Sequence, residues 1–388
     1  MMKHSLQQEL NGLIEKDLYR ELRVLESRDP TRARFEGREM LLFCGNDYLG
    51  LSRHPRVVKA ARDAFEKCGV GAGAARLISG TFPDHRKLEE RIARFKRKEA
   101  AIVFATGFLA NLGILTAFAG DEDVIIMDKL CHASLVDGAR LSGAALRVFP
   151  HKNYRVCETL LKKHQTARRR ILITEGVFSM DGDLADLETM IRMKEKYGAM
   201  LVVDDAHGTG VTGASGRGTT EPSGVAEGVD IVMGTLSKAI GGLGGFVAAD
   251  RTLIDYLVNF SRPFIFATAL PPALCAAAEE AFCLIEEEPD LRQKLWENIQ
   301  AVEGELRKAG FCPASAASAI LPVILGEEKK AIRAFEVLLS RGLYVPAVRY
   351  PTVPKGKARL RVTVSAAHTE QDIRELSDAL TYIERQGF

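Results

Sequence analysis

Two acids and a histidine directly follow a buried apolar stretch of this sequence. The stretch ends at Val202 and Val203, and Asp204, Asp205 and His207 come next, before two glycines. Ligands of parallel sheets bind at the carboxyl ends of the strands, so polar side chains at this position are placed for chemistry. The alternative is a strand exit capped by aspartate, because aspartate is a common capping residue.

A lysine occupies the same kind of position about thirty residues later. The apolar stretch Ile231 to Gly234 is followed by Thr235, Ser237 and Lys238 and then by a cluster of glycines. Partial burial lowers the pKa of a lysine and suits it to Schiff-base chemistry. The alternative is a solvated surface lysine, as most lysines are. The glycines favour the first interpretation, since they allow a ligand or the backbone to approach closely.

Two glycine-containing segments are candidates for binding an anion. Ala105 to Phe108 joins an expected strand to an expected helix, whose first turn offers free N–H groups and the positive end of the helix dipole. The loop Gly71 to Gly80 lacks the Gly-Lys-Ser/Thr of a P-loop. Neither segment has the dinucleotide spacing G-x-G-x-x-G, which disfavours a nicotinamide dehydrogenase.

Short apolar strands alternate with amphipathic helices from about residue 100 onward. This rhythm predicts an α/β fold with a mostly parallel sheet covered on both faces. The expected strands are Ala100 to Ala105, Asp123 to Met127, Leu146 to Phe149, Ile171 to Thr174, Met200 to Val203, Ile231 to Gly234 and Gly245 to Ala249. The expected helices are Phe108 to Phe118, Ala133 to Leu141, Val156 to His164 and Asp186 to Tyr197.

Changes in composition and hydrophobic pattern divide the chain into three parts. Residues 1–40 predict a helical arm, residues 41–280 the large domain, and residues 281–388 a smaller α+β domain that follows a long helical stretch up to about Leu306. In that last part we expect strands at Ile320 to Leu325, Leu343 to Ala347 and Leu360 to Ser365, and helices at Lys329 to Ser340 and Glu370 to Gln386.

Composition excludes several classes of partner. A net charge of +2 gives no electrostatic footprint for nucleic acid or an anionic membrane surface. The seven cysteines are scattered singly, with no metal-ligand spacing, which indicates a reducing compartment. The N-terminus lacks the apolar core of a secretory signal, and no apolar run approaches the roughly 18 residues of a membrane span. We therefore expect a cytoplasmic protein without a metal site.

Three motifs resemble a known family. Gly45 to Leu51, Thr174 to Asp183 and Asp204 to Gly210 resemble the α-oxoamine synthases, which are fold-type I, aspartate-aminotransferase-like enzymes that depend on pyridoxal phosphate. The segments Tyr350 to Gly356 and Ala358 to Thr363 most resemble the member that serves biotin biosynthesis. The resemblance implies that L-alanine condenses with pimeloyl-CoA or pimeloyl-acyl carrier protein and that carbon dioxide is lost. It also implies a homodimer with the active site at the subunit interface.

The resemblance implies roles for four catalytic residues. Lys238 is expected to carry the cofactor as a Schiff base and to move the substrate's Cα proton, and Asp204 to keep the pyridine nitrogen protonated. His207 is expected to bind the phenolic oxygen. His132 is expected to stack on the cofactor ring and to meet the substrate; the alternative is a packed or helix-capping histidine.

Further cofactor contacts follow from the same resemblance. Gly107 and Phe108 are expected to bind the phosphate through backbone N–H groups, together with the hydroxyl of Thr235. Ser179 is expected to face the cofactor's oxygen, with Glu175 supporting it from behind. The position of Thr268 resembles one that reaches a phosphate in the partner subunit.

Three residues are expected to bind substrate. Arg361 resembles the arginine that holds the amino acid's α-carboxylate, a task that suits a planar guanidinium. Arg23 resembles the arginine that meets the acyl substrate, although Arg20 lies one turn away, and Thr352 resembles a substrate-contacting threonine. The alternative for such arginines is a solvated surface charge.

Two other functions remain open from the sequence. A sister enzyme, such as glycine C-acetyltransferase or 5-aminolevulinate synthase, would share every cofactor residue. A catalytically silent relative with a scaffolding role would be expected to lose the lysine, whereas this chain retains Lys238, Asp204, His207 and His132.

Overall fold

The computed structural model describes residues 2–16, 18–222, 224–311 and 316–388, which form two compact units. The large unit is Asn46–Leu295, and the small unit combines Met1–Gly45 with Trp296–Phe388. These boundaries differ from the expected divisions after residues 40 and 280. The reason is that the N-terminal segment pairs with C-terminal elements: its Arg32 forms an ion pair with Asp372.

A seven-stranded sheet forms the centre of the large unit, with the order β4-β10-β9-β8-β7-β5-β6. All pairs are parallel except those of β10, which runs antiparallel to both β4 and β9. The strands are β4 (Ala100–Phe104), β5 (Val124–Asp128), β6 (Ala145–Phe149), β7 (Arg170–Glu175), β8 (Met200–Asp204), β9 (Ile231–Thr235) and β10 (Gly245–Ala249). The expected α/β fold and its seven strands are confirmed.

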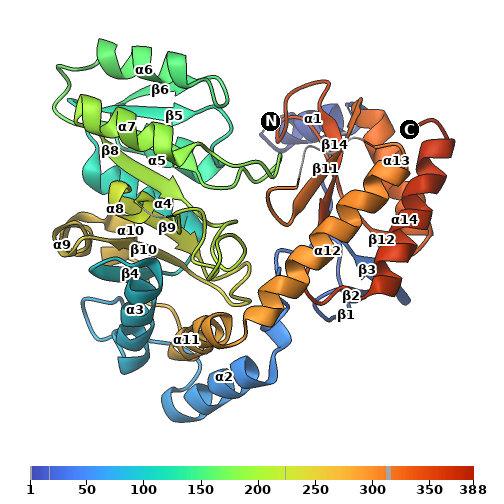
Figure 1. Ribbon diagram of the computed structural model, residues 1–388, viewed down its shortest axis with the longest axis horizontal. Coiled ribbons are helices and arrows are strands. Elements are labelled where there is room, and N and C mark those ends of the chain that lie inside the picture. Colours follow the sequence, from blue (N-terminus) through green and yellow to red (C-terminus); the bar gives the residue numbers. More distant parts are fainter. Residues whose placement is uncertain (1, 17, 223, 312–315) are drawn as a thin grey trace. The chain divides into compact units, whose positions relative to one another are not determined.

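Alternate residues of these strands face two separate cores. Ile125 and Met127 of β5 pack with α4, α5, α9 and α10, whereas Val124 and Ile126 pack with α6, α7 and α8. Figure 1 shows α6 and α7 beside β6 and β5 at one end of the sheet. Because both faces are covered, the central strands read as continuous apolar runs.

The four helices expected between the strands are present, and the structure adds further helices that were not predicted. The helices of the large unit are α2 (Pro55–Cys68), α3 (Pro83–Lys96), α4 (Gly107–Phe118), α5 (Ala133–Leu141), α6 (Tyr154–Lys163), α7 (Leu187–Tyr197), α8 (Val225–Gly228), α9 (Arg251–Phe260), α10 (Arg262–Ile265) and α11 (Pro272–Glu287), with a 3₁₀ turn at Leu51–Arg53. The long expected helical stretch is interrupted: α11 ends at Glu287, and Pro289 begins α12 (Pro289–Lys308). Proline is well tolerated in the first turn of a helix but not in its interior.

The small unit contains two small sheets. One has the order β1-β2-β3-β12 and the other β11-β14-β13. The elements are α1 (Met2–Glu15), β1 (Ser27–Arg28), β2 (Arg32–Phe35), β3 (Arg38–Leu42), β11 (Ile320–Gly326), α13 (Glu328–Ser340), β12 (Leu343–Tyr344), β13 (Ala347–Val348), β14 (Ala358–Thr363) and α14 (Glu370–Arg385). None of the helices in the described ranges is both long enough and apolar enough to cross a bilayer.

Two expectations for the small unit were wrong. Only α1 of the expected arm over residues 1–40 is helical, because residues 32–42 form a hairpin that turns at Glu36 and Gly37, both with positive φ. The expected strand from Leu343 to Ala347 is divided between the two sheets, β12 pairing with β3 and β13 with β14. Pro346 lies at the division, where a residue without an N–H group cannot continue a ladder.

Candidate active site

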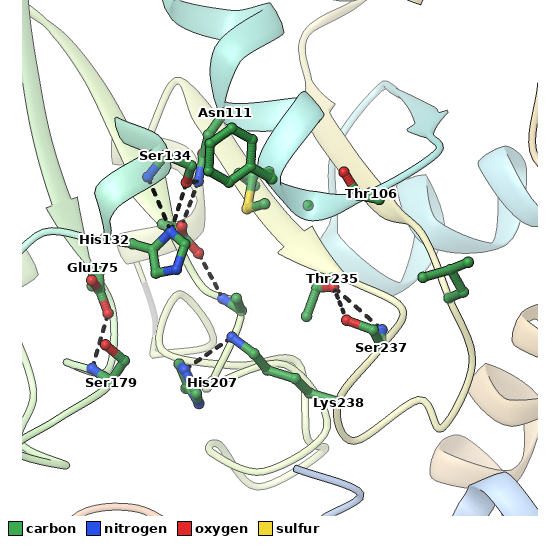
Figure 2. A pocket seen from close by; sticks show the side chains of 16 residues that line it. Thr106, Asn111, His132, Ser134, Glu175, Ser179, His207, Thr235, Ser237 and Lys238 are labelled. Carbon is green, nitrogen blue, oxygen red and sulfur yellow. Dashed lines mark hydrogen bonds between the residues drawn. The ribbon is translucent and has the colours of Figure 1, made fainter. Parts of the chain in front are cut away.

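A cavity of about 260 Å³ lies in the large unit at the carboxyl ends of the parallel strands (Figure 2). Its lining includes nine residues that the sequence had singled out: Gly107, Phe108, His132, Glu175, Ser179, Asp204, His207, Thr235 and Lys238. They come from five separate segments of the chain, which the sheet topology brings to one edge. The volume is close to the lower end of small-molecule sites, roughly 300–1,000 Å³.

Asp204 is the last residue of β8 and is buried, with 5% of its surface exposed. Its Oδ2 accepts a hydrogen bond from Asn111 Nδ2 at 2.8 Å, and its Oδ1 accepts one from the N–H of Ala206 at 3.0 Å. Asn111 Nδ2 also donates to Ser134 Oγ at 2.9 Å. The carboxylate is therefore held in one orientation by α4 and by its own loop.

Lys238 reaches the cavity from the turn after β9. Its Nζ lies 2.9 Å from His207 Nε2 (Figure 2). His207 Nδ1 lies 2.7 Å from the hydroxyl of Tyr48. His207 is thus held between a phenol and the lysine amine. The side chains of Lys238 and Asp204 line the same cavity. Their positions at the ends of two strands predicted that they would lie close together.

His132 lines the cavity and also caps a helix. It is the N-cap residue of α5, where its Nδ1 accepts a hydrogen bond from the N–H of Ser134 at 3.2 Å and lies 2.7 Å from Ser134 Oγ. Burial lowers the pKa of His132 below its usual value, and the nearby charge of Asp204 offsets only part of this decrease. A neutral ring with a fixed orientation results, so the capping role and a place in the cavity occur together.

The first turn of α4 forms one wall of the cavity. Thr106 Oγ1 accepts a hydrogen bond from the N–H of Leu109, and the first intrahelical donor is Ala110, so the N–H groups of Gly107 and Phe108 have no acceptor within the helix. A Cβ at Gly107 would come within 2.9 Å of Met233 Cε and 3.4 Å of Thr235 Oγ1. A turn with free donors and no side chain is suited to an anion.

Glu175 and Ser179 form a second wall. Glu175 ends β7 and is buried, and its Oε2 accepts a hydrogen bond from the N–H of Ser179 at 3.0 Å. Burial, and to a smaller extent the neighbouring charge of Asp204, raise the pKa of Glu175 to about 8. The charge of Lys238 acts in the opposite direction and lowers this pKa. The acid fixes the loop that presents Ser179.

Asp205 belongs to the same loop as Asp204 but binds a lysine outside the cavity lining. Its Oδ2 accepts a hydrogen bond from Lys96 Nζ at 2.7 Å, and both side chains are fully buried. Lys96 Nζ also donates to Thr209 Oγ1 at 2.8 Å. Asp205 Oδ1 accepts from the N–H and hydroxyl of Thr219 at 3.1 and 2.7 Å. This network fixes the segment that carries Asp204 and His207.

Four predicted site residues lie outside the cavity lining. Thr268 is exposed and forms an isolated bridge with Ala75 in the loop that the sequence had singled out. Arg23, Thr352 and Arg361 belong to the small unit. There Arg361 is buried in β14, Thr352 is exposed, and the guanidinium of Arg23 lies 4.9 Å from the centre of the Phe335 ring.

Sequence reasoning missed several residues of the site. Asn111 and Ser134 line the cavity, and Tyr48 binds His207 from behind it. Asn111 had a usable signal, because it is a polar residue within the otherwise apolar helix Gly107–Phe118. Ser134 had no such signal, since small hydroxyl residues are common at helix starts.

Known proteins resemble the chain along nearly its whole length. The family described as aminotransferase class I and II matches residues 38–380. A putative 8-amino-7-oxononanoate synthase from Desulforudis audaxviator is 49% identical over 98% of each chain, and an 8-amino-7-oxononanoate synthase from Geobacter sulfurreducens is 46% identical over 99% of each.

Solved structures share the fold. A variant of serine palmitoyltransferase from S. paucimobilis, with a bound aldimine of pyridoxal phosphate and myriocin, superposes with a TM-score of 0.93 at 33% identity, covering 98% of this chain and 97% of that one. An 8-amino-7-oxononanoate synthase from Francisella tularensis has a TM-score of 0.77 at 28% identity, covering 90% and 98%. The chain therefore belongs to the aminotransferase class I and II family and, within it, to the α-oxoamine synthases.

Proposed function

We propose that this protein catalyses the reaction for which its curated relatives are named. In that reaction L-alanine condenses with a pimeloyl thioester, on CoA or acyl carrier protein, and gives 8-amino-7-oxononanoate, carbon dioxide and the free thiol. The observation that carries the proposal is the convergence of Lys238, Asp204 and the first turn of α4 on one cavity, in a chain 46% identical to a relative of that name.

Three features of the cavity support pyridoxal phosphate as its cofactor. Asn111 Oδ1 is buried without a hydrogen-bond partner among the described residues, which a bound polar ring would account for. The space beside Gly107 that a Cβ would fill borders the hydroxyl of Thr235, which suits a phosphate. The donor set also fits, since it combines an amine, a buried carboxylate and an imidazole.

The bound cofactor supplies an electron sink for negative charge at the α-carbon of an attached amino acid. We assign to Asp204 the task of holding a proton on the ring nitrogen, helped by the fixed orientation that Asn111 gives it. Lys238 Nζ would hold the cofactor covalently until the amino group of the substrate displaces it, and the freed amine would then move the proton at the substrate's α-carbon. His132 stacks against the ring and orients the substrate. His207 binds the phenolic oxygen through the nitrogen that now contacts Lys238.

The other predicted site residues bind either the cofactor or the substrates. Gly107, Phe108 and Thr235 bind the phosphate, and Ser179 faces the cofactor's oxygen. In the small unit, Arg361 binds the α-carboxylate of alanine, Arg23 meets the acyl substrate, and Thr352 contacts substrate.

The protein acts as a homodimer, in which Thr268 contacts a phosphate bound by the partner subunit. The exposure of Thr268 and of the neighbouring Phe266 supports this arrangement, since both side chains are available to a second copy. Sedimentation of the holoenzyme should therefore show a dimer, and Thr268→Ala should weaken cofactor binding without lowering the thermal stability of the large unit.

The decisive assay offers amino acids and thioesters in pairs to the purified protein and identifies products by mass spectrometry. L-alanine with pimeloyl-CoA or pimeloyl-acyl carrier protein should give 8-amino-7-oxononanoate. Lys238→Ala should give none and should lack the adduct that borohydride fixes on the wild-type chain. A preference for glycine with acetyl-CoA or succinyl-CoA, or for serine with palmitoyl-CoA, would replace this proposal with a sister activity. A protein that ignores added pyridoxal phosphate would refute it.

A further inference from the structure

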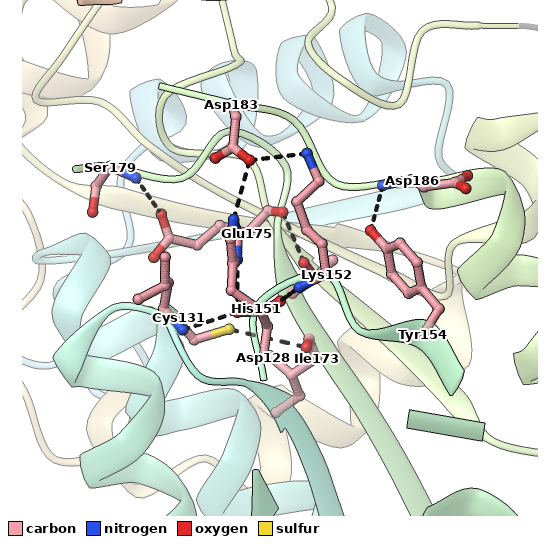
Figure 3. Close-up of polar contacts among 12 residues, drawn as sticks. Asp128, Cys131, His151, Lys152, Tyr154, Ile173, Glu175, Ser179, Asp183 and Asp186 are labelled. Atoms are coloured by element: carbon pink, nitrogen blue, oxygen red, sulfur yellow. Dashed lines mark hydrogen bonds and ion pairs between the residues drawn. The ribbon is translucent and has the colours of Figure 1, made fainter. Parts of the chain in front are cut away.

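One imidazole outside the cavity binds two carboxylates from two different segments. His151 follows β6, and its Nδ1 lies 3.0 Å from Asp128 Oδ1 while its Nε2 lies 3.1 Å from Asp183 Oδ2 (Figure 3). A neutral imidazole has one donor, whereas the protonated ring donates from both nitrogens. Two carboxylate partners therefore select the imidazolium, which bridges them.

The first of these carboxylates shapes the turn that leads to His132. Asp128 ends β5, and its Oδ1 also accepts a hydrogen bond from the N–H of Leu130 at 2.9 Å. Its backbone carbonyl accepts from the N–H of Cys131 at 3.2 Å. The next residue is His132, which lines the cavity. Asp128 thus holds the turn that immediately precedes His132.

The second carboxylate closes the loop that carries Ser179. The N–H of Phe178 donates to the carbonyl of Asp183 at 2.9 Å, and Val177 forms a bridge with Leu184. The loop therefore depends on the position of Asp183. The ring of Phe178 is buried and meets His151 edge-on, with centroids 4.4 Å apart and an interplanar angle of 87°.

We propose that His151 is a positioning residue that connects the turn presenting His132 to the loop presenting Ser179, and so holds these two segments of the cofactor site at a fixed distance from each other. This role rests on the proposed function of the cavity, but it adds a residue that lies outside its lining. Through its two hydrogen bonds, His151 joins the segments that begin at the ends of β5 and β7, which are neighbouring strands of the sheet.

Charge supports the same role. The groups that face His151 are Asp128 from β5, Asp183 from the loop and Lys152 beside it, whose Nζ binds Asp183 Oδ2 at 2.9 Å and whose N–H binds Asp128 Oδ2 at 2.8 Å. Two acids and two bases give a balanced cluster. Burial lowers the pKa of His151, but the hydrogen bonds to Asp128 and Asp183 outweigh it and raise that pKa to about 9. The bridge is therefore complete at neutral pH and is lost as the pH rises through about 9.

The experiment compares His151→Gln with His164→Gln in the holoenzyme. His164 is a matched control, because it lies at the end of α6 and contacts Arg147 rather than either loop. His151→Gln should speed amide hydrogen exchange over residues 128–133 and 176–184. It should also weaken cofactor binding by about 10- to 100-fold, by analogy with the loss of partners that orient metal ligands. His164→Gln should change neither.

A pH series separates positioning from mere stability. The ratio of wild-type to variant cofactor affinity, read from the visible absorbance of the bound cofactor, should shrink toward one above about pH 9, where the wild-type ring is neutral. Asp183→Asn removes the other end of the bridge and should reproduce the faster exchange if His151→Gln does not fold.

Two results would overturn the role of His151. One is cofactor affinity within twofold of wild type at pH 7 with unchanged exchange in both segments. The other is exchange that rises equally throughout the large unit, which would indicate general destabilisation. Neither readout uses an acyl substrate. A wild-type protein that fails to condense alanine would therefore refute the proposed function and leave this result intact.

Discussion

Lys96→Met tests how much the buried ion pair behind the catalytic loop contributes to the large unit. The substitution keeps most of the side-chain volume but removes the ammonium, so Asp205 loses its charged partner while both positions remain fully buried. Removing one partner of a buried pair typically costs about 3–5 kcal/mol, because the other charge stays uncompensated. Thr219 still satisfies Oδ1 of Asp205, so we expect the lower half of that range.

A matched control distinguishes burial from ion pairing as such. Lys59→Met breaks a pair of nearly the same length, 2.6 Å between Lys59 Nζ and Asp63 Oδ2, on the exposed surface of α2. Exposed pairs contribute only about 0–1 kcal/mol, so this variant should unfold almost like wild type. The large unit should be followed by native-state amide exchange of β8 and β9. The single tryptophan, Trp296, lies in the other unit and would not report it directly.

The double variant Lys96→Met, Asp205→Asn decides the cause of the loss. If an uncompensated charge is responsible, neutralising Asp205 should recover much of the lost free energy of unfolding. The reasoning is refuted if Lys96→Met costs no more than Lys59→Met, or if the double variant is as unstable as Lys96→Met alone.

Three further outcomes are expected. Asn111→Ala leaves Asp204 with one hydrogen bond fewer, a loss of about 1–3 kcal/mol that should weaken cofactor affinity about tenfold or more in an absorbance titration; an unchanged affinity would contradict it. Gly245→Ala places a Cβ 2.6 Å from the backbone of the first residue of α4 and should cost about 1–3 kcal/mol in thermal unfolding, whereas Gly304→Ala, with open space around it, should not destabilise its helix. His368 is buried, and burial lowers its pKa from 6.5 to about 4. Its neutral ring therefore contributes stability that is complete above about pH 6.5 and is lost as the pH falls toward 4. The free energy of unfolding measured in urea should fall by roughly 2 kcal/mol between pH 7 and pH 5, and His368→Gln should abolish this dependence on pH.

The large unit was predictable because its central strands are buried on both faces. These strands are mainly apolar runs, and the polar residues at the end of β8 and after β9, Asp204 and Lys238, therefore stand out at the edge where ligands bind. The hairpin of β2 and β3 was missed because its sequence is dominated by arginine and glutamate. Its alternation of Arg32, Ala33, Arg34 and Phe35, of which Ala33 and Phe35 are buried, was the available signal.

The site was only partly predictable because some of its contacts are tertiary. Tyr48 precedes His207 by 159 residues, and Asn111 precedes Asp204 by 93, so no local pattern connects them. The role of His151 depends in the same way on three segments that only the sheet brings together. Motifs at strand ends reveal which side chains face a ligand, whereas the residues that hold them in place come from elsewhere in the chain.

The small unit is built from both ends of the described chain, and this has a consequence for its synthesis on the ribosome. Strand β3 pairs with β12, and Arg32 binds Asp372, which is translated 340 residues later. At about 5–20 residues per second, the N-terminal hairpin waits roughly 17–70 s for these partners. During that time β3 exposes an unpaired edge, while the whole large unit, Asn46–Leu295, is synthesised. Nascent chains stalled before β12 should therefore recruit chaperones through the hairpin while the large unit is already folded.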